Sequence, residues 1–148
     1  MNYDLSEEAI PMSPTLSAIM AYDDVSSAKR GKAAWDQVLK TLGDSYSMAL
    51  RLWKFEVLRI PELKEVAVSE AAKADLIFIA ASGSNDIPTE VKAWIELWLR
   101  QKRNHPSALV ALCDPSTATV DQSRAQCVAY LRDVAHRAGM DFFAAPST

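Results

Sequence analysis

Three short polar stretches carry the side chains with which this chain could do chemistry. Asp23-Asp24 offer carboxylate oxygens, which Mg²⁺ prefers as ligands. Ser26-Ser27 come next, where backbone N–H groups at a helix start could hold a phosphate. Ser82-Gly83-Ser84-Asn85 are small enough to lie against a flat ligand. A structural reading competes in each case: solvated carboxylates or helix caps for the first two stretches, and a plain turn for the third.

The cysteines and histidines add no complete catalytic set. Cys113 ends an apolar run and could be a reactive thiol, but no histidine is near it, so a small buried side chain is favoured. Cys127 falls on an apolar helical stripe and is predicted to be core. Two cysteines are too few for a disulfide framework and fit no zinc spacing, so we expect both to be reduced.

The elements that must position these stretches alternate along the chain between strand and helix. Residues 76–81 and 108–112 are solid apolar runs, typical of strands buried on both faces. Two further strands are expected at 15–22 and 141–145. Residues 47–55 alternate apolar and polar, which favours an edge strand. Helices are expected between the strands, near residues 26–42, 61–74, 88–103 and 119–138.

This βαβαβαβαβ order predicts an α/β fold, a three-layer, doubly wound parallel sheet of five strands with helices on both faces. The commonest arrangement of five such strands is the flavodoxin-like order 2-1-3-4-5. Locally, Ser26 or Ser27 is expected to cap the first helix, and Gly31 to let that helix approach the sheet closely. A basic group is expected to face the negative end of the third helix: Arg100, Lys102 and Arg103.

In sheets of this kind ligands bind beyond the carboxyl ends of the strands, where the strand order reverses. That rule brings residues 23–27 and 82–85 to one edge and predicts a small-molecule site there. Trp53 ends the second strand and could reach the same edge.

Length and composition narrow the class of protein. A chain of 148 residues predicts a single domain, 15–148, preceded by a flexible N-terminal tail, 1–14, broken by Pro11 and Pro14. The net charge of −3 argues against nucleic acid or an anionic membrane as partner. Without a signal peptide or an apolar run of ~20 residues, the expected location is cytoplasmic. Leu97 and Leu99 widen the apolar surface of the third helix, which favours a homodimer through helix 88–103, with burial inside the monomer as the alternative.

Residues 74–96 resemble the central unit of the flavodoxin-fold NAD(P)H-dependent FMN reductases. Ala74-Asp75, the apolar strand, Ile87-Pro88, Val91-Lys92 and Ile95-Glu96 carry the resemblance. It implies FMN lying across residues 82–85. In that family a proline and an aromatic stand where this chain has Ser82 and Ser84, and only Asn85 matches the flavin loop.

The acidic pair Asp23-Asp24 resembles that of response-regulator receivers. Receivers also need an aspartate after the third strand and a lysine after the fifth, where this chain has Ala80-Ala81-Ser82 and Ala144-Ala145-Pro146. Phosphotransfer is therefore not expected. The sequence favours a binding or protein-interaction module, and the alternative is an FMN-dependent NAD(P)H oxidoreductase with Trp53 over the flavin. A third hypothesis is a metal site on the acidic pair.

Overall fold

The computed structural model describes residues 15–43, 47–81, 87–102, 106–113 and 121–144. Two parts of the sequence-based prediction, the tail 1–14 and the loop Ser82-Gly83-Ser84-Asn85, lie outside these residues.

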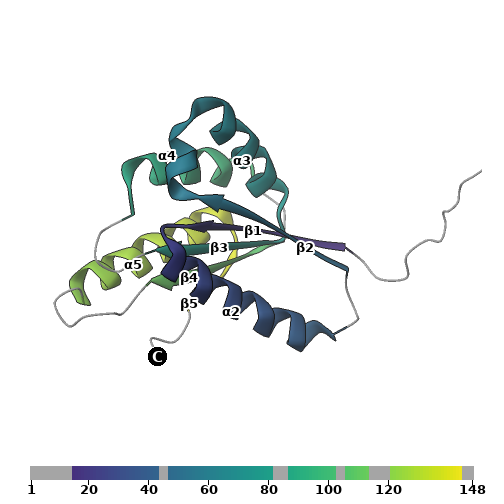
Figure 1. Ribbon diagram of the computed structural model, residues 1–148. Coiled ribbons are helices and arrows are strands. Elements are labelled where there is room, and N and C mark those ends of the chain that lie inside the picture. Colours follow the sequence, from purple (N-terminus) through teal and green to yellow (C-terminus); the bar gives the residue numbers. More distant parts are fainter. Residues whose placement is uncertain (1–14, 44–46, 82–86, 103–105, 114–120, 145–148) are drawn as a thin grey trace, which may run out of the picture.

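The described strands form one parallel sheet in the order β2-β1-β3-β4-β5, which confirms the α/β class and the flavodoxin-like order (Figure 1). The two solid apolar runs are neighbours, paired in register from Leu76↔Ala108 to Ala81↔Cys113. The alternating strand lies at an edge, as expected, and pairs with β1 alone. The strands are β1 (Thr15–Tyr22), β2 (Ser47–Lys54), β3 (Leu76–Ala81), β4 (Ala108–Cys113) and β5 (Asp141–Ala144).

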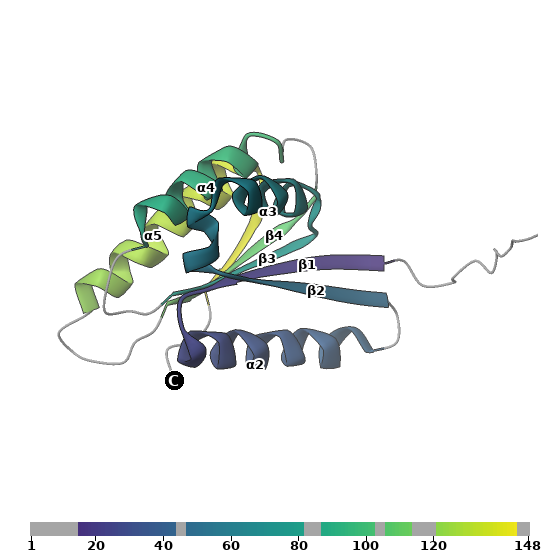
Figure 2. The same ribbon diagram turned by 45° about the horizontal axis from the view of Figure 1, so that its top comes forward.

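The helices divide unequally between the two faces of the sheet. In Figure 2, α3, α4 and α5 lie over one face of the sheet, and α2 lies under the other. The helices are α2 (Val25–Leu42), α3 (Pro61–Lys73), α4 (Thr89–Leu99) and α5 (Asp121–Ala138), with a 3₁₀ helix over Phe55–Arg59. The prediction of helices on both faces is confirmed, but the cover on the α2 face is incomplete.

Two apolar cores follow from this division. The larger core, between the sheet and α3, α4 and α5, contains Ile77, Ile79 and the fully buried Trp94 and Trp98. The smaller core lies under α2, where Trp35 meets Phe78 edge to face at 6.0 Å between ring centroids.

Gly31 allows α2 to lie close to the sheet, as its place on the apolar face predicted. A Cβ atom at Gly31 would stand well inside contact distance of Met20 Sδ on β1, and Met20 is fully buried. An added methyl group would displace the thioether end of Met20, which is flexible but must then find new space in a packed core.

Gly31→Ala is therefore expected to destabilise the protein by about 1 kcal/mol. Alanine gains about 1 kcal/mol of helix propensity, but overpacking costs about 1–3 kcal/mol. Urea unfolding measures the difference. In a Met20→Ala background, which removes the obstructing sulfur, the same Gly31→Ala change should be stabilising. A stabilising effect in the wild-type background would show that the helix does not need glycine for its approach.

Helical spacing predicts a buried stripe on α3 formed by Leu63, Val66, Ala67, Ala71 and Ala74, and in the structure the buried face is rotated from this stripe. Leu63 and Val66, expected to be buried, are 38% and 47% exposed, whereas Val68 is buried. The alanines of the stripe, Ala67 and Ala71, are fully buried as predicted. Small side chains fit where α3 lies against the sheet, so the bulkier residues of this helix face outward.

The sequence predicts that Lys102 faces the negative end of its own helix, but the structure buries its side chain against the end of α3. Its Nζ donates to the backbone oxygens of Ala72 and Ala74, at the end of α3. It therefore interacts with the negative end of a different helix from the one predicted. Burial lowers the pKa of Lys102 to about 8, and the nearby Asp75 carboxylate partly opposes that shift.

The two cysteines form a disulfide, so the prediction of reduced thiols is wrong. Cys113 ends β4 and Cys127 lies on the buried face of α5, with Cα atoms 6.5 Å apart. The crossover from β4 brings α5 back over the same strand, and the sequence spacing alone gave no sign of this contact. Because disulfides are rare in reducing compartments, the cysteines no longer support the predicted cytoplasmic location.

Candidate functional site: the carboxyl edge and the α2 groove

Asp24 caps α2, so the prediction that Ser26 or Ser27 caps it is wrong. The Asp24 Oδ1 atom accepts hydrogen bonds from the backbone N–H and the hydroxyl of Ser27, each at 2.8 Å. These bonds lower the pKa of Asp24 below its ordinary value. An ionised carboxylate therefore occupies the amide that a phosphate would need at this helix start.

Asp23 and the serines take separate positions at the same edge. The Asp23 backbone N–H donates to Ala80 O at 3.1 Å, which ties the end of β1 to β3. Ser27 is buried and Ser26 is exposed. Within the described residues, no three His, Cys, Asp or Glu side chains cluster closely enough to hold a metal ion.

Arg30 binds backbone oxygens at the carboxyl ends of two central strands, a role that was not predicted from the sequence. From α2 its Nη2 donates to Ala81 O at 3.2 Å and to Leu112 O at 3.5 Å. Its buried Nε finds no partner in the described part of the chain. The available clue was position, because Arg30 adjoins Gly31 on the helix that passes under those strands.

Trp53 is half-buried, and its polar atom is already bonded. The indole N–H donates to Glu70 Oε1 on α3 at 2.8 Å. The other oxygen of Glu70 pairs with Arg51 Nε at 3.4 Å. The structure therefore brings Trp53 together with α3.

A large cavity lies on the α2 face, toward the amino ends of the strands. It has a volume of about 780 Å³, within the range of ligand sites. We call it the α2 groove. Its wall is the flank of α2, including Ala34 and Val38, and its floor is formed by Phe78, Val110 and Phe143 of β3, β4 and β5.

The α2 groove exists because α2 reaches across only part of the sheet. One row of side chains crosses this face in register, Met20↔Phe78↔Val110↔Phe143. Met20 and Phe78 are fully buried, Val110 is partly buried and Phe143 is 56% exposed. Burial therefore falls with each strand away from α2, although every side chain in the row is apolar.

The polar side chains of the α2 groove are acidic or neutral. Asp75 and Asp141 lie at the amino-end rim, while Gln37 and Thr41 belong to the α2 wall. Asp75 Oδ2 accepts from the backbone N–H of Ser17 at 2.9 Å, and Asp141 is exposed. No lysine, arginine or histidine lines the groove in the described part of the chain.

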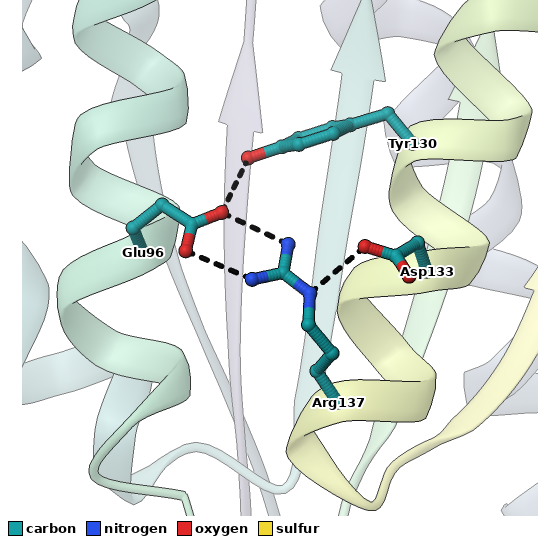
Figure 3. A network of polar contacts seen from close by, with 4 residues as sticks. All are labelled: Glu96, Tyr130, Asp133 and Arg137. Carbon is teal, nitrogen blue, oxygen red and sulfur yellow. Dashed lines mark hydrogen bonds and ion pairs between the residues drawn. The ribbon is translucent and has the colours of Figure 1, made fainter.

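The opposite face is tied together by a polar network between α4 and α5 (Figure 3). Arg137 donates to both carboxylate oxygens of Glu96, each at 2.9 Å, and its Nε donates to Asp133 at 2.8 Å. The hydroxyl of Tyr130 donates to Glu96 at 3.3 Å. The Arg137 bonds lower the pKa of Glu96, and burial raises that of Tyr130.

Arg137→Gln is expected to cost about 1 kcal/mol of unfolding free energy at neutral pH, since the bidentate pair is partly solvated. The folded pKa of Glu96 is depressed, so this stabilisation is present above its unfolded value and is lost as pH falls through the folded one. Denaturant unfolding of the wild type and of Arg137→Gln, at pH 7 and in acid, measures the cost at neutral pH and its loss at low pH. Arg59→Gln is the control, because its single contact to Glu90 is longer, at 3.6 Å, and should contribute almost nothing. Equal costs for the two variants would contradict this ranking.

No protein-family model matches the chain, and no curated protein sequence matches it. None of the helices in the described ranges combines the length and apolar character needed to cross a membrane.

Proposed function

We propose that this protein is a binding module of flavodoxin-like fold, and that the α2 groove is its interaction surface. The observation that carries the proposal is the exposure of Phe143, 56%, at the end of an otherwise buried apolar row. A parallel sheet is normally covered on both faces. Uncovered apolar surface on a folded protein commonly marks an interaction site.

The carboxyl edge supports a ligand less well in the part the structure describes. Asp24 binds the first turn of α2, Arg30 binds strand ends, and Trp53 binds Glu70. A small molecule at that edge stays a prediction that depends on residues 82–85. The FMN-dependent alternative is disfavoured by the Asp24 carboxylate at the phosphate position. Titration of the protein with FMN, followed by visible absorbance, tests it directly.

The predicted homodimer through helix 88–103 would have less exposed apolar surface available to it than the sequence suggested. Leu99 is buried in the monomer, and Leu97 remains 42% exposed. Leu97→Asp would break a dimer that uses this helix, and sedimentation would detect the change. The cytoplasmic location likewise stays a prediction.

An uncharged fluorescent dye such as Nile red tests the groove as a binding surface. Phe143→Asp should weaken dye binding by about tenfold or more, because one aromatic contact contributes about 1.5–3 kcal/mol of burial energy. Val66→Asp is the matched control, an apolar-to-acid change at an exposed position of α3 on the other side of the sheet, and should leave binding unchanged. Equal effects of the two changes would contradict the proposal.

A further inference from the structure

We propose that the Cys113–Cys127 disulfide is a redox-controlled latch on the C-terminal unit of the domain, which consists of α5 and β5. Reduction of this bond leaves the closed structure in place but lets the unit detach from the rest of the domain far more often. The inference is independent of the α2 groove, because the disulfide joins β4 to α5 on the opposite face of the sheet (Figure 2).

The C-terminal unit lies at the periphery of the fold. β5 is an edge strand of 4 residues that pairs with β4, from Ala108↔Asp141 to Ala111↔Ala144. α5 packs over β4 and β5 and beside α4. Because the unit is contiguous in sequence and occupies one edge of the sheet, it can open while β1, β2, β3 and β4 stay paired.

The disulfide crosses the boundary between this unit and the rest of the domain. Cys113 ends β4, and Cys127 is the first buried side chain among those described on α5. The contacts that hold α5 beside it are noncovalent: apolar packing in the larger core, and the partly exposed ion pair of Arg137 with Glu96. The disulfide is therefore the restraint that persists when those contacts open.

The loop that the disulfide closes sets the size of the effect. While the bond is intact, a detached α5 stays tied to β4 across a sequence separation of 14 residues. Closing a loop of about 15 residues removes chain entropy from the open state and lowers its population roughly 100-fold. Reduction restores that entropy, so the unit opens roughly 100-fold more often.

The closed structure tolerates reduction, because both cysteines lie in the apolar core. Cys113 is 5% exposed and Cys127 is 1% exposed. Free thiols behave as small apolar side chains and pack well at such positions. Opening, in contrast, exposes both thiols together with Leu109 and Ala111 of β4, which are buried in the same core.

Reduction by a dithiol is a balanced two-electron exchange. A thiolate of the reductant bonds to Sγ of Cys113, the more exposed of the two residues, as the S–S bond breaks. Cys127 leaves as a thiolate and takes up the proton that the reductant released. The second thiol of the reductant then displaces Cys113, which is protonated in turn, and the reductant leaves as a cyclic disulfide.

Amide hydrogen exchange of the full chain, resolved by NMR, tests the latch before and after reduction with dithiothreitol. The α5 amides of Leu131 and Val134 should exchange roughly 100-fold faster after reduction. In the reduced protein they should also exchange roughly tenfold or more faster than the amide of Phe78 in β3, which reports on opening of the whole domain. Far-ultraviolet circular dichroism should not change on reduction.

The double variant Cys113→Ala/Cys127→Ala is the matched control. It should show the exchange rates of the reduced wild type and should not respond to dithiothreitol. Equal rates for α5 and β3 after reduction would mean that the bond stabilises the domain as one unit, and unchanged α5 rates would mean that it restrains no opening. Either result would overturn the latch. So would a bond that dithiothreitol cannot reduce in the folded protein, or alkylation of both cysteines in denaturant without reductant.

Discussion

Trp94→Ala is expected to lower the free energy of unfolding by about 3–5 kcal/mol, a large part of the stability of a domain of this size. Trp94 lies on α4, is fully buried, and meets Trp98 edge to face at 5.8 Å between ring centroids. Removing the indole leaves a cavity between the sheet and α4 and also removes this aromatic pair. Urea unfolding followed by far-ultraviolet circular dichroism measures the loss.

Trp94→Phe separates packing from polarity at the same position. The Trp94 Nε1 is buried and has no hydrogen-bond partner in the described part of the chain. Phenylalanine loses some volume but removes an unpaired donor whose burial costs about 1–3 kcal/mol. The net change should stay within about 1 kcal/mol of wild type. A phenylalanine variant as unstable as the alanine variant would show that the indole N–H is bonded after all.

The second large effect is a pH dependence of the free energy of unfolding, which comes from Lys102. Its folded pKa is about 8, below the ordinary value of 10.5, because burial disfavours the charged form. Below pH 8 both states bind the proton and the cost of burying the charge is fully present. Between pH 8 and 10.5 only the unfolded state holds the proton, so stability rises with pH. Above 10.5 both states are neutral and the cost is gone.

Lys102→Met isolates the contribution of Lys102 to the pH dependence of the unfolding free energy, because every other titrating group is shared with the wild type. The unfolding free energy of the wild type relative to Lys102→Met should rise by about 3 kcal/mol from about pH 7 to about pH 10.5. The absolute offset also includes the bonds lost to Ala72 and Ala74, so the change with pH is the quantity to compare. A difference that stays constant with pH would mean that Lys102 keeps its ordinary pKa.

The strand order could be predicted because its determinants are local in sequence. Solid apolar runs occur at β3 and β4, alternation occurs at the edge strand β2, and helical spacing separates them. Parallel strands need crossovers of one handedness, and this rule leaves few arrangements. Gly31 was interpretable for a similar reason, since a glycine on an apolar helical face has few roles besides close approach.

Most departures depend on which distant residues meet. The helix cap is a local exception: β1 ends at Tyr22 as predicted, but α2 begins at Val25, so its N-cap is Asp24 and not a serine. Lys102 binds the end of α3, and Cys113 meets Cys127, through contacts that appear only after the helices pack. Coverage of the sheet, in contrast, follows from the predicted strand order: with right-handed crossovers, only the connection from β1 to β2 steps in the opposite direction across the sheet, which places α2 on the face opposite to the other described helices.

Methyl-resolved NMR of the full chain during titration with Nile red is the most direct test of the α2 groove as the binding surface. Val38 and Val110 line the groove, whereas Val91 and Val134 lie in the core on the other face. The proposal predicts saturable chemical-shift changes at Val38 and Val110 and little change at Val91 and Val134. In Phe143→Asp, the changes at Val38 and Val110 should disappear. Shifts concentrated at Val91 and Val134, with Val38 and Val110 unmoved, would contradict it.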